Sequence, residues 1–171
     1  MVSNELRNDI RQGLLDSARS SLYYATLAGR YRRRDRSLKY LTLISATGSF
    51  SAWLDIMPSS WQSPVQLIAS GGVALFVLWG LIAEYARKEA LLYTVTAQCE
   101  KIEDKWGSLW VDVKRGVFYR DNDIVSHRDK LKQAGREWTQ LTGYAGISDA
   151  PYLNEACIAE ASKVIKKRYA T

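Results

Sequence analysis

A block of 44 residues that is almost free of charge is the feature that most constrains this chain. Of the 42 charged residues, 24 Lys and Arg and 18 Asp and Glu, only Asp55 lies between Tyr40 and Ala83. In a water-soluble core, apolar residues recur with the helix or strand period and are interleaved with charged ones. One long uncharged block between charge-dense flanks predicts instead a chain in two solvents, with the block in lipid and the flanks in water.

The block divides into two predicted membrane spans, residues 40–57 and 65–83, joined by residues 58–64. The second span has 19 residues without a charge, which reach about 28 Å as a helix, close to the thickness of the hydrocarbon layer. The first span is more polar, and it inserts more readily when a strongly apolar span follows closely. Because the connection is so short, the two spans are expected to form an antiparallel hairpin.

Basic residues are concentrated immediately before the first span. The members of this basic run are Arg30, Arg32, Arg33, Arg34, Arg36 and Lys39. Basic residues next to a span mark its cytoplasmic side, and the connection between the spans has none of them. Both tails are therefore expected to be cytoplasmic, with the basic run flanking the membrane. Nucleic-acid binding and an ordinary solvated helix face are the alternative interpretations of the same run.

Small and hydroxylated side chains follow helical spacing in the first span, with an acidic residue at its outer end. They are Thr42, Ser45, Gly48, Ser49, Ala52 and Asp55. In lipid, such a face lets helices pack closely, with hydroxyl groups bonding across the interface. Repeated around an oligomer, the same face would line a water-filled path. Span packing is the simpler interpretation, and a pore lining is the alternative.

The flanks predict an all-α fold: a cytoplasmic helix in residues 1–38, the hairpin in 39–84 and further cytoplasmic helices in 85–171. After the second span, apolar residues alternate in steps of three and four, as in a coiled-coil seam. One helix is expected to continue from the membrane to about Gly116. The seam, buried in a bundle or shared between subunits, comprises Leu92, Val95, Cys99, Ile102, Trp106, Leu109 and Val113.

Three further apolar stripes predict the other helices of the bundle. The last helix is expected to start at Asp149–Ala–Pro151, since Pro is favoured in the first turn. The stripes are Leu6, Ile10, Leu14 and Ala18 before the first span; Leu131, Ala134, Trp138, Leu141 and Ala145; and Leu153, Cys157, Ala161 and Val164.

A search for chemistry finds no standard catalytic, nucleotide-binding or zinc motif in the sequence. Cys99 and Cys157 belong to no CxxC pair, so reduced and packed thiols are expected. His127 is interpreted as a capping or solvated residue, and Asp121–Asn122–Asp123 as a turn. The first 38 residues show no secretory signal. We therefore expect no enzyme, no cofactor and no metal site.

The order of the parts resembles a known family. The segment ATLAGRYRRRDRSLKY, the polar first span, the Pro-flanked connection, the apolar second span and EYARKEALLYTVTAQCEKIEDKW follow one another within residues 10–145. This arrangement is similar to a SLATT domain, the two-transmembrane effector domain associated with SMODS nucleotide cyclases and SLOG sensors. The resemblance implies a bacterial anti-phage effector that acts on the inner membrane. It also implies a partner such as a nucleotide synthase or a reverse transcriptase, and it supplies no catalytic residues.

The expected function is therefore a non-enzymatic, oligomeric effector that permeabilises the bacterial inner membrane when a partner signals. The alternative is a membrane-anchored helical scaffold that binds a cytoplasmic protein or nucleic acid without conducting. A soluble bundle with an apolar central hairpin is a third interpretation. Membrane lipids, other copies of the chain and a defence partner are the expected binding partners.

Overall fold

Helices make up almost all of the chain that the computed structural model describes, namely residues 2–46, 71–80, 83–117, 121–147 and 150–169. Residues 71–80 are helical, and no strand occurs within the described ranges. The all-α fold class is confirmed for these residues. The named helices are α1 (Asn4–Ala46), α4 (Tyr85–Arg115), α5 (Asp121–Tyr144) and α6 (Pro151–Tyr169).

The described helices form two compact units. The first consists of residues up to Ala28 together with those from Ala90 onward, and the second of Gly29–Glu89. Helices α1 and α4 each contribute residues to both units. The predicted segments 1–38, 39–84 and 85–171 were divided by charge, at Lys39 before the uncharged block and Glu84 after it, and they stay a prediction.

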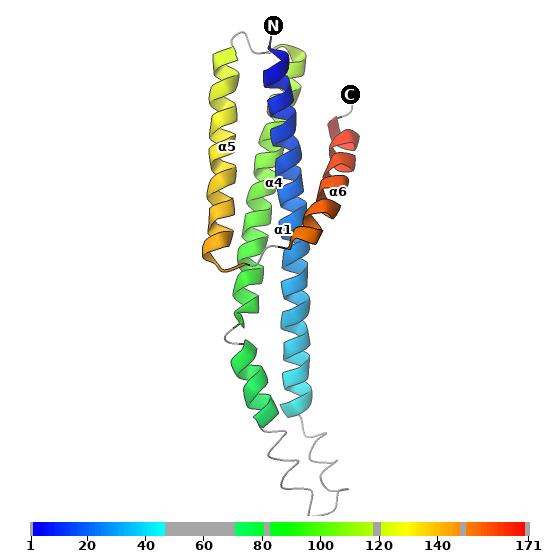
Figure 1. Ribbon diagram of the computed structural model, residues 1–171, viewed down its shortest axis with the longest axis vertical. Helices are drawn as coiled ribbons and strands as arrows, with labels where there is room; N and C mark the ends of the chain where they lie inside the picture. Colours follow the sequence, from blue (N-terminus) through cyan, green and yellow to red (C-terminus); the bar gives the residue numbers. More distant parts are fainter. Residues whose placement is uncertain (1, 47–70, 81–82, 118–120, 148–149, 170–171) are drawn as a thin grey trace, which may run out of the picture. The chain divides into compact units, whose positions relative to one another are not determined.

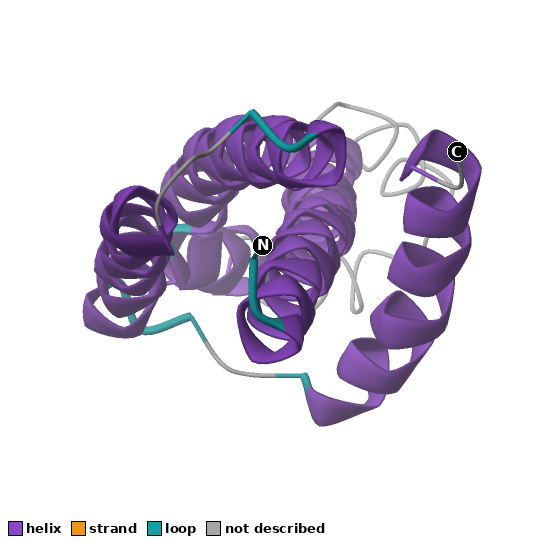
Figure 2. Ribbon diagram, turned by 90° about the horizontal axis from the view of Figure 1, so that it is seen from above, coloured by secondary structure: helices purple, strands orange, loops and turns teal. Residues whose placement is uncertain are grey.

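The first unit is a bundle in which α5 and α6 lie on opposite sides of the paired α1 and α4 (Figure 1; Figure 2). All four helices contribute buried side chains to one apolar cluster, which is the core of the unit. The stripe predicted on α1 lies in this core. The members of the cluster that are at most 2% exposed are Ile10, Leu14, Ala18, Trp106, Val113, Ile124 and Ala161.

Two of the predicted stripes are partly wrong in register. On α5, Leu141 is exposed, and the buried positions are Ile124 and Thr142. On α6, Val164 is half-buried and Ile165 is buried in its place. The buried residues of α6 recur every four positions up to Ile165, so the contact face rotates slowly around the helix, as expected for a period of 3.6.

The helix predicted to run unbroken from the second span to Gly116 is interrupted. Glu84 has a φ of 46°, and the next helix, α4, begins at Tyr85. The Glu84 carbonyl accepts the backbone N–H of Lys88 at 3.0 Å, so Glu84 is the N-cap of α4. Neither Gly nor Pro occurs at this position, so the break could not be predicted from the residue types.

Helix ends follow the expected capping chemistry. Ser3 is the N-cap of α1, because its hydroxyl accepts the backbone N–H of Leu6 at 3.2 Å. Gly116 and Gly146, with φ of 71° and 62°, end α4 and α5 in the left-handed conformation. In both cases the N–H of the following residue bonds five residues back, as in a Schellman motif. The predicted end near Gly116 agrees with this.

The segment Asp121–Asn122–Asp123, predicted as a turn, is instead the start of α5. Carboxylates in the first helical turn interact favourably with the positive end of the helix dipole. At the other end of the connection, α6 begins at Pro151, as predicted.

Within the described ranges, no helix combines the length and the apolar character needed to cross a bilayer. Both predicted spans, 40–57 and 65–83, fall partly on residues 47–70 and 81–82, which are outside the described part.

Candidate functional site

In the second unit, exposed apolar side chains are concentrated in two short segments, residues 40–43 and 75–79. Both segments come from the predicted spans. Other exposed large apolar residues are scattered along the chain. The seven side chains in the two segments, between 44% and 69% exposed, are Tyr40, Leu41, Leu43, Leu75, Val77, Leu78 and Trp79.

The predicted basic run lies on α1, immediately before the first of these segments. Within it, Arg32 is 3.9 Å from Glu89, and Lys39 forms an ion pair with Asp35 at 2.5 Å. The side chains of Arg33, Arg34 and Arg36 are exposed and form no ion pair within the described ranges. Three uncompensated guanidinium groups are thus available to an anionic partner within about one helical turn.

The predicted face of the first span is described only at its start. Thr42 is half-buried, and its hydroxyl donates a hydrogen bond to the Leu38 carbonyl at 2.8 Å, within α1. Ser45 belongs to α1, whereas Gly48, Ser49, Ala52 and Asp55 lie outside the described residues. The predicted face thus lies mostly outside the described residues, and it stays a prediction.

The predicted seam lies on the buried face of α4. Its seven members, Leu92, Val95, Cys99, Ile102, Trp106, Leu109 and Val113, are all at most 8% exposed. The last three and Ile102 pack with α1, α5 and α6 of the same chain. This part of the seam is thus occupied within one chain, so a subunit contact through it would require the bundle to open.

The closest packing at the seam is between Trp106 and α1. A Cβ added to Gly13 would lie 2.6 Å from Cζ2 of the Trp106 indole, closer than real Cβ contacts. Gly13 therefore allows α1 to approach the buried indole, which is 2% exposed. The sequence pattern placed Trp106 in the seam but gave no signal for its partner on α1.

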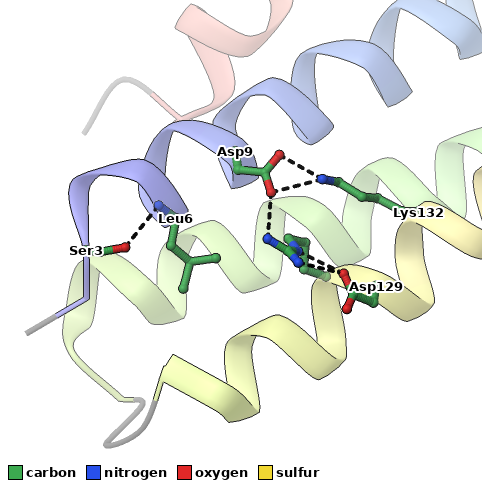
Figure 3. A network of polar contacts seen from close by, with 6 residues as sticks. Ser3, Leu6, Asp9, Asp129 and Lys132 are labelled. Carbon is green, nitrogen blue, oxygen red and sulfur yellow. Dashed lines mark hydrogen bonds and ion pairs between the residues drawn. The ribbon is translucent and has the colours of Figure 1, made fainter.

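An ion-pair network joins the N-terminal part of α1 to α5 (Figure 3). Lys132 donates to both carboxylate oxygens of Asp9, at 2.8 and 2.9 Å, and Arg128 donates to Asp9 at 2.9 Å. Arg128 also binds Asp129. The hydrogen bond from Lys132, followed by the charges of Lys132 and Arg128, lowers the pKa of Asp9 although partial burial opposes this.

A second polar contact joins α4 to α6. Glu103 is buried, accepts a hydrogen bond from Arg168 at 3.0 Å and another from the Ser21 hydroxyl at 3.3 Å. Burial raises the pKa of Glu103, and the attraction of Arg168, whose side chain is 57% exposed, only partly offsets this. At this carboxylate, the effect of burial on the pKa is therefore larger than the opposing effect of the ion pair with Arg168.

Neither polar contact was predicted. Asp9 and Lys132 are 123 residues apart, and Glu103 and Arg168 are 65 residues apart. In the sequence, each is one more charged residue on an amphipathic helix. The sequence offers one indication of burial, at Glu103. This residue follows Ile102 of the seam and therefore lies near the buried face of α4.

No group of three or more potential ligands that would hold a metal ion occurs in the described part of the chain. Cys99 and Cys157 are buried free thiols. No protein-family model matches the chain, and neither the curated proteins nor the solved structures contain a match. Together, fold and contacts define an all-α protein with a four-helix unit and a second unit that exposes apolar side chains.

Proposed function

We propose that residues 40–57 and 65–83 form a membrane-spanning helical hairpin, with both ends of the chain on the cytoplasmic side of the bacterial inner membrane. The observation that carries this proposal is the exposure of apolar side chains in residues 40–43 and 75–79. Exposed apolar patches of this kind mark contacts with lipid or with another protein. Tyr40 and Trp79 have the amphipathic rings that are enriched at the level of the lipid headgroups.

The abrupt change of exposed chemistry along α1 supports the same assignment. The exposed residues from Arg32 to Lys39 are largely basic, and the next exposed ones on α1, Tyr40, Leu41 and Leu43, are apolar. Arginine side chains before a span favour its cytoplasmic orientation and attract anionic lipid headgroups. A solvated helix has no physical reason to change from a basic to an apolar surface between two adjacent residues.

We further propose that the protein is a non-enzymatic effector whose subunits assemble in the membrane and permeabilise it when a partner protein signals. The support is the polar face of the first span, together with the resemblance to SLATT domains. Because Ile102, Trp106 and Val113 of the seam pack within one chain, assembly is proposed to use the spans rather than this seam. Small and hydroxylated side chains are suited to such contacts in lipid.

The membrane assignment is tested on the full chain expressed in bacteria. We expect it to remain in the membrane fraction after an alkaline carbonate wash. In a variant lacking Cys99 and Cys157, a single Cys introduced in residues 58–64 is expected to react with an impermeant maleimide added from outside. Recovery in the aqueous fraction without detergent would rule out the hairpin.

The permeabilising activity is tested separately, by release of a dye from liposomes that contain the purified protein. Replacing Thr42, Ser45 and Ser49 with Leu is expected to abolish release without preventing insertion. Thr94→Leu, at an exposed hydroxyl of α4, is the matched control and is expected to leave release unchanged. Liposomes that stay sealed in the presence of the activating partner would contradict the activity.

A membrane-anchored scaffold is the second candidate function. It is favoured by Arg33, Arg34 and Arg36, whose exposed side chains form no ion pair with any described residue and would serve an acidic cytoplasmic partner as well as anionic lipid. Sealed liposomes, together with co-purification of a nucleotide synthase, a reverse transcriptase or nucleic acid that is lost in the triple Arg→Gln variant, would select this function.

A further inference from the structure

A cavity of about 500 Å³ lies in the first unit, between α1, α4 and α5. Its volume is within the range of small-molecule sites in proteins. Ile102 and Trp106 of α4 and Leu131 of α5 provide apolar lining. The residues that α1 and α5 contribute are otherwise mostly polar or glycine, and several of them are exposed, so the cavity is open to solvent on this side.

The charges along this cavity are only partly compensated. At one position, Asp9 of α1 and Lys132 of α5 bind each other. Asp16 of α1 receives only the side-chain amide of Gln12, at 3.3 Å, and has no cationic partner in the described part of the chain. Arg136 of α5 has neither an ion pair nor a hydrogen bond among the described side chains. Asp16 and Arg136 are both exposed, so the cavity carries one acid and one base on different helices that are accessible from solvent and have no charged partner in the described chain.

The hydroxyl groups of the cavity present acceptors rather than donors. Ser17 donates to the Leu14 carbonyl at 3.0 Å, and Ser20 donates to the Asp16 carbonyl at 2.8 Å. A hydroxyl has one hydrogen to donate and two lone pairs, so what remains available is acceptor capacity. The α1 wall, with its carboxylates and these hydroxyls, is therefore suited to a ligand group that carries N–H donors.

Gly135, in the interior of α5, also lines the cavity. Glycine lowers helix stability relative to alanine, so an interior glycine normally has a packing reason. Here a Cβ would meet nothing within 4 Å, which contrasts with Gly13, where it would collide with Trp106. Close packing therefore does not explain Gly135, and its effect is to leave the cavity open.

We propose that this cavity binds a small zwitterion with an apolar body, of the chemical class of a free aromatic or large aliphatic amino acid. Its carboxylate would bind Arg136, its ammonium group would bind Asp16 and the acceptors of the α1 wall, and its side chain would lie against Leu131 and the accessible edge of Ile102. With two acidic and two basic side chains in the lining, the cavity is suited to a ligand without net charge. All these residues belong to the first unit, so the proposal is independent of the membrane hairpin and of any leakage.

The test is isothermal titration calorimetry of the purified full chain, in non-ionic detergent, with three probes. L-phenylalanine carries both charges, 3-phenylpropionate lacks the ammonium group and phenethylamine lacks the carboxylate. We expect phenylalanine to bind most tightly. Arg136→Gln should weaken phenylalanine and phenylpropionate about tenfold and leave phenethylamine unchanged, because a charged hydrogen bond is lost. Asp16→Asn should weaken phenylalanine and phenethylamine instead.

Filling the cavity gives a second test that does not change charge. Gly135→Leu should abolish phenylalanine binding while circular dichroism shows that the helices are retained. Gly143→Leu, at another α5 glycine with open space around its Cβ and outside the cavity lining, should bind like the parent. Absence of phenylalanine binding to the parent chain would overturn the proposal, as would equal binding by all variants.

Discussion

Asp9 accepts hydrogen bonds from Lys132 through both carboxylate oxygens, at 2.8 and 2.9 Å, across 123 residues of sequence. This contact joins α1 to α5, which is otherwise attached to the core mainly through Ile124 and the half-buried Leu131 and Trp138. The side chain of Asp9 is 33% exposed and that of Lys132 is 39% exposed. Its contribution to stability is therefore that of a partly screened ion pair.

Asp9→Asn is expected to lower the free energy of unfolding by about 1 kcal/mol, since solvent screens part of the attraction. Urea unfolding followed by circular dichroism at neutral pH measures this. Glu155→Gln, at an exposed α6 carboxylate without an ion pair in the described chain, is the control and should change stability by less than about 0.5 kcal/mol. Equal effects of the two substitutions would show that the network contributes nothing.

The same pair predicts a dependence on acid. The hydrogen bond from Lys132 is the largest cause that lowers the pKa of Asp9 in the folded chain. A lowered folded pKa gives stability that is complete above the unfolded value, about 3.9, and is lost as the pH falls through the folded value. The stability difference between the parent and Asp9→Asn should thus be constant near neutrality and shrink below about pH 4. A difference that persists at pH 2 would contradict this cause.

Glu103 predicts the opposite behaviour, because burial raises its pKa. A raised carboxyl pKa gives a contribution that is complete below the unfolded value, about 4.3, and is lost as the pH rises through the folded value. Glu103→Gln removes this loss, so it should become more stable than the parent by up to about 1 kcal/mol at neutral pH. The gain should disappear near pH 4. Destabilisation by Glu103→Gln at neutral pH would show that the bond to Arg168 dominates.

Features that repeat along one helix could be predicted from the sequence. Features that depend on contact with a second helix could not. The stripe from Leu6 to Ala18 and the seam from Leu92 to Val113 are apolar at helical spacing, and their residues are buried. The break at Glu84 depends on one residue with positive φ, and this residue is not a glycine, the type that normally indicates such a conformation. The Asp9 and Glu103 contacts depend on how distant helices meet.

The candidate site could be predicted only where it depends on the order of charged and apolar residues along the chain. The basic run and the start of the first span were predicted from segregation of charge, and the exposed arginines and Tyr40 are consistent with that pattern. The cavity had no signal in the sequence, because Gly135 and Arg136 are unremarkable until α1 and α4 are placed beside them. A cavity is a property of the space between helices and not of any one of them.

The thiol of Cys99 is expected to react very slowly in the folded chain. Burial raises its pKa to about 11, so at pH 8 the thiolate fraction is on the order of 100-fold lower than for an ordinary thiol. In a Cys157→Ala variant, iodoacetamide labelling followed by mass spectrometry should be correspondingly slow, and fast in urea. Labelling of the folded chain at the rate measured in urea would show that this part of the bundle opens readily.

Gly13→Ala tests the closest packing of the bundle. The added Cβ would lie 2.6 Å from the Trp106 ring, so the ring or α1 has to shift, although the indole is only 2% exposed. We expect a loss of about 1–3 kcal/mol in the free energy of unfolding, as for other overpacked cores. Gly29→Ala is the matched control, because it changes another α1 glycine whose Cβ would meet nothing within 4 Å. The control should gain up to about 1 kcal/mol from helix propensity alone. If both variants were stabilised, α1 would have room to shift, and the contact between Gly13 and Trp106 would not set the distance between α1 and α4.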